Sequence, residues 1–161
     1  PCEAAGAIAL GQCVVVAGAD GKIKAAGNPV ATTGPQGGAS SIRYTAKQPA
    51  ERFPLLQVKY ITTGINTPLS LEIAGGELRV TFATDGAGTA TSTVNDIVAA
   101  IAANSTISTF IEADTYGGAG TGTPPPDAID FAGLDKSANT IGIAQQAATA
   151  DGDVIDVFLA I

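Results

Sequence analysis

The sequence predicts a mainly β protein, α+β overall, in which strands from both ends of the chain form one body and the middle of the chain is inserted into it. Residues 140–161 have the pattern of two strands joined by a turn at 150–152, with apolar residues at alternate positions of the second strand. Residues 13–27 repeat this pattern around an Asp-Gly turn at 20–21. Because an apolar strand needs a partner, we expect the two ends to pair and to close a β-barrel or β-sandwich.

The first strand pair is expected within residues 11–27. Its first strand, 12–17, is continuously apolar, which is typical of a strand buried on both faces. In the second strand, Lys22 and Lys24 alternate with apolar residues, so one side of that strand is expected to face water. The following stretch, 28–41, is rich in Gly, Pro and Thr and is predicted to be a loop.

The Gly- and Pro-rich stretches divide the chain into two predicted parts. Residues 1–40 and 124–161 are expected to form the terminal body, and residues 41–123 the inserted domain, a small β-β-β-α-β unit. A short strand at 128–132 is expected to lead back to the body. Strands of the inserted domain are predicted at 41–46, 55–61, 69–82 (as a hairpin) and 109–113.

The hairpin at 69–82 has the clearest strand pattern. Apolar residues alternate with polar ones on both sides of a Gly-Gly pair at 75–76. A two-residue turn at this pair places all the alternating apolar side chains on one face. The same register sets Glu72 opposite Arg79 on the other face, an opposite-charge pair that stabilises a hairpin.

One amphipathic helix is predicted near 93–103. Thr93 can cap its N-terminus, and Asp96 lies in the first turn, where negative charge is favoured. The helix is expected to pack on the apolar face of the 69–82 hairpin. Its apolar stripe consists of Val94, Ile97, Val98, Ile101 and Ala102.

Composition excludes some classes of partner. Eight basic residues against fifteen acidic ones give a net charge of -7, and the basic residues are scattered. We therefore expect no nucleic-acid surface and no docking on an anionic membrane. Only 14% of residues are charged, and a large surface with so few charges is expected to self-associate or to be covered by a partner.

The sequence shows no arrangement of residues typical of catalysis. It has no His, and its carboxylates, Lys, Tyr and Cys form no nucleophile and base pattern. Asp151, Asp153 and Asp156 lack the ligand spacing of a calcium loop. We therefore predict no enzyme, no cofactor and no metal site. Cys2 and Cys13 either form one disulfide or remain two thiols.

Two glycine runs, at 34–38 and 117–122, have the composition of phosphate-binding loops. Neither follows a strand and opens a helix in the required way, and neither carries the Lys-Ser/Thr pair of a P-loop. Both are predicted to be flexible connectors.

Four segments resemble the small capsid decoration, or cement, proteins of tailed bacteriophages. They are Gly-Gln-Cys-Val-Val-Val at 11–16, Ala-Asp-Gly-Lys-Ile-Lys-Ala-Ala-Gly at 19–27, Thr-Ile-Gly-Ile-Ala at 140–144 and Ala-Asp-Gly-Asp-Val-Ile-Asp-Val at 150–157. The middle of the chain, with Ser-Ile-Arg-Tyr-Thr-Ala-Lys at 41–47 and Leu-Arg-Val-Thr-Phe-Ala-Thr-Asp at 78–85, is similar to a module of phage virion proteins. The long insert departs from many such cement proteins, which are little more than the terminal body.

The resemblance implies a structural virion protein that decorates and stabilises a phage capsid by binding between subunits of the major capsid protein. It also implies a homotrimer on the capsid exterior, assembled in the host cytoplasm. Residues 1–10 and 28–40 are expected to be the flexible arms that reach the shell, because such segments become ordered only when a partner stabilises them. The candidate contact residues are Pro1, Cys2, Glu3, Pro29, Thr32, Thr33, Pro35 and Gln36.

Two other functions stay open at this point. One is a tail or head-tail component of a phage, which would form rings or tubes. The other is a secreted surface or adhesin module that binds glycans, and a disulfide between Cys2 and Cys13 would favour it.

Overall fold

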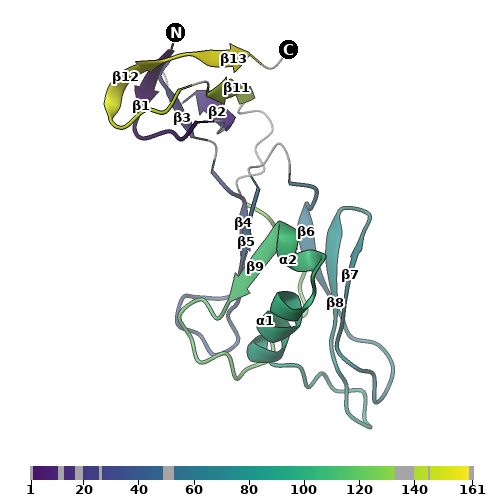
Figure 1. Cartoon of the computed structure of the whole chain (residues 1–161). Coiled ribbons are helices and arrows are strands. Elements are labelled where there is room, and N and C mark those ends of the chain that lie inside the picture. The colour runs from purple at the N-terminus through teal and green to yellow at the C-terminus, as the bar shows by residue number, and fades with distance from the viewer. Residues whose placement is uncertain are drawn as a thin grey trace. The chain divides into compact units, whose positions relative to one another are not determined.

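The computed structural model (Figure 1) describes residues 2–10, 13–16, 20–25, 27–48, 53–132, 140–144 and 146–159. Within these ranges the protein is mainly β, as predicted, and none of its three sheets closes into a barrel. The chain divides into two compact units. The described residues of unit 1 lie in 2–25, 27, 140–144 and 146–159, and those of unit 2 lie in 28–48 and 53–132.

Unit 1 contains one six-stranded sheet with the order β12-β1-β3-β2-β11-β13. Strand β1 pairs with β12 and strand β2 pairs with β11, both antiparallel, so the two ends of the chain do share one sheet. Strands β2 and β3 form the expected antiparallel pair. The strands are β1 (Cys2–Ala5), β2 (Cys13–Val16), β3 (Ile23–Ala25), β11 (Thr140–Ala144), β12 (Asp151–Ile155) and β13 (Val157–Leu159).

The sheet of unit 1 must curve strongly. Its two edge strands, β12 and β13, are separated in the chain by Asp156 alone. In a flat sheet of six strands the edges lie about 24 Å apart, whereas the Cα atoms on either side of one residue are at most about 7 Å apart. The curved sheet encloses a small core made of Ala4, Ile8, Val14, Ile23, Ala144, Ala148 and Ile155.

Two predictions about unit 1 are wrong. Strand β11 pairs with β13 and not with β12, so the tail is no simple hairpin, and Gly152 lies inside β12 rather than in a turn. Strand β2 is not buried along its whole length, because Val14 is fully buried while Val16, on the same face of the strand, is 48% exposed. A run of valines therefore does not imply burial of each one.

Unit 2 contains a four-stranded sheet, β10-β6-β8-β7, and a three-stranded sheet, β4-β5-β9. A bridge between Val30 and Ala132, with two backbone hydrogen bonds of 3.0 and 2.7 Å, connects β4 to the end of β10. The strands are β4 (Val30–Thr32), β5 (Arg43–Ala46), β6 (Gln57–Ile61), β7 (Ser70–Ala74), β8 (Glu77–Thr81), β9 (Ile111–Asp114) and β10 (Ile129–Asp130).

The hairpin of β7 and β8 has the predicted register. Ile73 pairs with Leu78 and Glu72 with Arg79, around a turn in which Gly75 and Gly76 both have positive φ. The expected ion pair across the hairpin is not the one formed. Arg79 Nε lies 3.1 Å from Glu77 Oε2 on its own strand, because Glu77 at the start of β8 is within reach on the same face.

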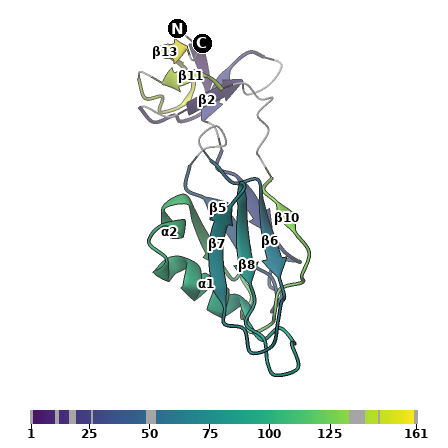
Figure 2. The ribbon, with the colours of Figure 1, turned by 90° about the vertical axis from the view of Figure 1, so that its right-hand side faces the viewer.

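Helix α1 (Val94–Ala103) begins at the predicted residue. Thr93 and Asp96 form a capping box, in which the Thr93 side chain accepts a hydrogen bond from the Asp96 N–H and the Asp96 carboxylate accepts one from the Thr93 N–H. The helix contacts β9 as well as β7 of the hairpin, so it packs against both outer strands of unit 2 (Figure 2). A short helix that the sequence did not reveal, α2 (Ile107–Phe110), connects α1 to β9.

The segment 28–41 is not simply a loop. Strand β4 lies within it and pairs with β5, with Ala31 opposite Tyr44. The neighbouring Pro29 and Gly34 suggested a loop, but three residues suffice for an edge strand when β5 is already in place. The structure assigns residues 28–40, and also residues 124–132 with β10, to unit 2, whereas the sequence analysis assigned both stretches to the terminal body.

The two glycine runs are packed against each other and are not free connectors. Gly37 N–H donates to Tyr116 O at 2.9 Å, and Gly122 N–H donates to Ala39 O at 3.0 Å. A Cβ atom on Gly118 would meet the carbonyl oxygen of Gly38. Small residues therefore serve close backbone packing here rather than flexibility.

The second glycine run also caps helix α1. The N–H groups of Val94 and Asn95 donate to the carbonyl oxygens of Gly122 and Gly120, each at 3.0 Å. Such N–H groups have no partner within the helix, so the loop satisfies two donors that would otherwise need water.

Candidate functional site

The N-terminal contact candidates lie in a paired strand. Cys2 and Glu3 belong to β1, where they pair with Ile155 and Val154 of β12, and Pro1 lies outside the described residues. The expectation of a flexible arm at residues 1–10 is therefore wrong for β1, whose Ala4 is fully buried. Cys2 is a half-buried free thiol, and the side chain of Cys13 lies outside the described part of the structure.

The other contact candidates lie in unit 2 around strand β4. Pro29 and Thr33 are buried, whereas Thr32, Pro35 and Gln36 are exposed. The Thr33 hydroxyl accepts a hydrogen bond from Ile42 N–H at 2.9 Å, which gives this residue a structural role. The described candidates are therefore divided between the two units, with Cys2 and Glu3 in unit 1 and the other five in unit 2.

A charged cluster on unit 1 connects three strands. The Lys22 ammonium lies 2.9 Å from Glu3 Oε1 and 2.9 Å from Asp151 Oδ1. These hydrogen bonds, to Glu3 first and to Asp151 second, raise the pKa of Lys22. Lys22 was expected to face water, but its side chain is 25% exposed because the two carboxylates of neighbouring strands surround it.

Asp153 stabilises the turn that precedes β12. Asp153 accepts hydrogen bonds from the N–H groups of Thr149, at 2.8 Å, and Ala150, at 3.1 Å. These bonds, the one from Thr149 above all, lower the pKa of Asp153.

In the described ranges no three His, Cys, Asp or Glu residues are grouped so that they could hold a metal ion. Likewise, no helix in these ranges is long and apolar enough to cross a membrane.

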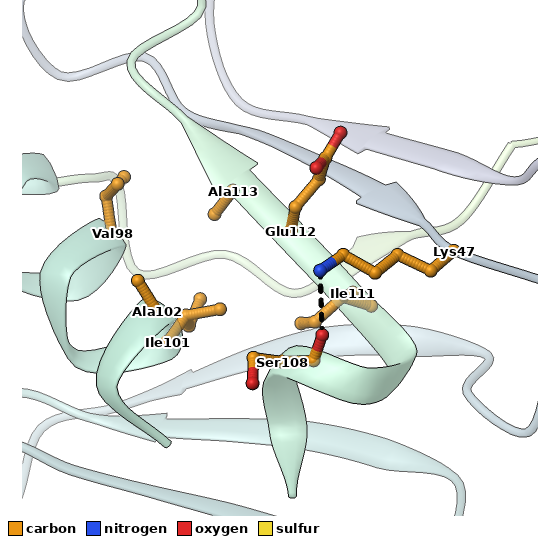
Figure 3. A pocket seen from close by; sticks show the side chains of 8 residues that line it. All are labelled: Lys47, Val98, Ile101, Ala102, Ser108, Ile111, Glu112 and Ala113. Atoms are coloured by element: carbon orange, nitrogen blue, oxygen red, sulfur yellow. Dashed lines mark hydrogen bonds between the residues drawn. The ribbon is translucent and has the colours of Figure 1, made fainter. Parts of the chain in front are cut away.

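Unit 2 has a pocket with a volume of about 330 Å³ between α1, α2 and β9 (Figure 3). Helix α1 contributes Val98, Ile101 and Ala102 to its wall. Strand β9 contributes Ile111 and Ala113. These five apolar side chains from two elements face a common space.

The polar groups of the pocket are few. Lys47, Glu112 and Ser108 complete its lining, and only Lys47 and Glu112 among the lining residues ionise. The Lys47 ammonium donates to the Ser108 carbonyl oxygen at 2.8 Å. The pocket thus combines five apolar residues with Ser108, one cation and one carboxylate.

The sequence analysis did not find this pocket. It interpreted Val98 and Ile101 only as the buried stripe of a helix, and it did not predict α2, which positions Ser108.

Comparison of the chain with protein-family models, curated proteins and solved structures finds no match. The function therefore has to be inferred from the residues of this chain.

Proposed function

We propose that the protein is a structural virion protein that decorates the exterior of a phage capsid and stabilises it by binding between subunits of the major capsid protein. One observation carries this proposal. The four segments that resemble phage cement proteins form two pairs at opposite ends of the chain, 11–27 and 140–157, yet strands from all of them, β2, β3, β11 and β12, belong to one sheet. A likeness spread along the chain thus corresponds to one structural unit.

The surface of unit 1 supports a role in binding other proteins. Leu10, Val16 and Val154 are 69%, 48% and 63% exposed, a large apolar exposure for so small a unit. Burying such side chains against capsid subunits would stabilise the shell by the hydrophobic effect without any chemical turnover. We propose that the terminal body is a β-sandwich that forms a homotrimer and contacts the shell. We propose further that the middle of the chain is a domain inserted into this body.

The first test is immunogold labelling of particles from the source culture with antibody against the recombinant protein. Regular label over phage heads is the expected result. Label on tails would instead assign the protein to a tail or head-tail position. Label on cell envelopes with bare virions would overturn the proposal and favour a secreted glycan-binding module.

A matched pair of variants tests which unit contacts the shell. Val154→Ser removes an exposed apolar side chain from unit 1, and Ile65→Ser removes one that is 65% exposed from unit 2. We expect the first variant to bind undecorated heads more weakly in co-sedimentation and the second to bind as the wild type does. Equal binding by the wild type and both variants would contradict a contact with the shell through Val154 of unit 1.

A further inference from the structure

The hydrogen bonds around β5 show which way the backbone of β9 points. Ala46 N–H donates to Pro29 O, and Thr33 N–H donates to Ile42 O, so the even-numbered residues of β5 bond to the β4 side. Lys47 N–H donates to Phe110 O, so the odd-numbered residues bond to β9. This is the alternation of antiparallel strands.

The backbone of Ala113 therefore points away from β5. Ala113 is opposite Tyr44, an even-numbered residue that bonds to β4. Strand β9 is the last strand of its sheet, so the N–H and C=O of Ala113 lie on a free edge. In the described part of the chain neither group has a hydrogen-bond partner, whereas Ile111 N–H is used by Ile107 O.

This free edge borders the pocket. Ala113 and Ile111 line the space, and α1 forms the wall opposite them with Val98 and Ala102 (Figure 3). The result is a groove between a strand edge and a helix. An extended peptide fits such a groove, because its backbone N–H and C=O groups form hydrogen bonds with the strand edge and its alternate side chains enter apolar pockets.

Lys47 adds charge to one end of the groove. Its backbone bonds to Phe110, immediately before β9, so its ammonium lies near the start of that strand. An ammonium has three N–H donors, and the Ser108 carbonyl oxygen takes one of them. The remaining donors suit a carboxylate, which binds an ammonium more strongly than a neutral acceptor does. Glu112 also lines the pocket, but in the described part of the chain it forms no ion pair with Lys47, so these donors can bind a carboxylate of the ligand.

We propose that this groove, lined by Lys47, Val98, Ala102, Ile111 and Ala113, binds an extended segment of a partner protein that adds to β9 as an antiparallel strand. One apolar side chain of the segment fills the pocket, and a carboxylate at its carboxyl end binds Lys47. The direction follows from the position of Lys47, since the carboxyl end then lies at the amino end of β9. This inference does not depend on the proposed role on a capsid.

The probes are three N-acetylated peptides of five residues. The first is Thr-Val-Thr-Val-Val with a free terminal carboxylate, the second is its amide, and the third is the amide with Glu as the last residue. Each is titrated into the full-length ¹⁵N-labelled protein and followed by NMR. We expect the amide signals of Val98, Ala102 and residues 111–114 to shift, with the Ala113 amide moving downfield as its N–H gains an acceptor.

Variants separate the parts of the proposal. Ala102→Gln narrows the groove, and Ala99→Gln is the same change on an exposed residue of α1 that does not line it. We expect the first to weaken binding about tenfold, the effect of roughly one lost contact, and the second to leave it unchanged. Lys47→Met is expected to weaken binding of the carboxylate peptides about tenfold and to leave the plain amide unaffected.

The outcomes are distinct. Preference for the free acid identifies a terminal carboxylate, and preference for the Glu amide identifies an acidic side chain. If neither is preferred over the plain amide, the carboxylate assignment is wrong. If no peptide shifts the groove signals at millimolar concentration, while the wild-type spectrum shows a folded protein, the groove does not bind extended peptides and the proposal fails.

Discussion

The hydroxyl oxygens of Tyr44 and Tyr60 lie 2.7 Å apart in the core of unit 2, where they join strand β5 of one sheet to strand β6 of another. Tyr44 is fully buried. The Tyr60 ring stacks on the Phe82 ring, with 5.2 Å between the two ring centroids. A buried hydroxyl without a partner is costly, so each of these tyrosines makes the burial of the other acceptable.

The two hydroxyls should contribute to the stability of unit 2 as a pair and not independently. Tyr44→Phe leaves the Tyr60 hydroxyl buried without its partner, and we expect a loss of about 1–3 kcal/mol in the free energy of unfolding of unit 2. The double variant Tyr44→Phe/Tyr60→Phe should lose less than the sum of the two single variants. Urea unfolding followed by far-ultraviolet circular dichroism measures this cycle, and additive losses would show that the two hydroxyls do not interact.

The same pair should make unit 2 sensitive to alkaline pH. Burial raises the pKa of Tyr44 and of Tyr60 above the ordinary value of 10.0. Folding thus favours the protonated form of both tyrosines, so their contribution to the free energy of unfolding is complete below pH 10. As the pH rises further, the free energy of unfolding falls by up to about 1.4 kcal/mol per pH unit for each tyrosine. Urea midpoints between pH 9 and 11 should fall for the wild type and should be flatter for the double phenylalanine variant. Identical pH profiles for the two proteins would contradict this assignment.

Local sequence patterns predicted the elements of unit 2 well. The Gly75-Gly76 turn and the alternation around it determined the register of β7 and β8, and Thr93 with Asp96 determined the start of α1. Each of these signals lies within a few residues, where backbone geometry and capping act directly.

Contacts between distant segments could not be predicted in this way. Strand β4 exists because β5 offers it a partner, and the pocket exists because α2 positions Ser108 beside Lys47. The packing of the two glycine runs is also a tertiary effect, because composition shows that a chain can be flexible but not whether another loop holds it in place.

Gly118 should be the most sensitive position of this glycine packing. A Cβ atom there would meet the Gly38 carbonyl group, so Gly118→Ala has to displace one loop from the other. We expect a loss of about 1–3 kcal/mol in the stability of unit 2, as for other overpacked sites. Gly86→Ala is the control, because its added Cβ would have only Asn66 Oδ1 nearby, at 3.9 Å, and should change stability by less than about 1 kcal/mol. Equal stability of the two variants would show that the loops separate easily.

Lys22 should determine how strongly unit 1 responds to salt and to alkaline pH. Its ammonium binds Glu3 of β1 and Asp151 of β12, so Lys22→Met removes both ion pairs while keeping most of the apolar stem. Because these partners raise the pKa of Lys22, the stabilisation is complete below pH 10.5 and is lost as the pH rises further.

Hydrogen exchange of β1 and β12 amides should be faster in Lys22→Met at neutral pH, and the difference should shrink at about 1 M salt, where charges are screened within roughly 3 Å. Lys24→Met, which removes an exposed lysine from β3, two residues after Lys22, should leave the exchange unchanged. Equal exchange rates in both variants would mean that the pairing of β1 with β12 needs no support from Lys22.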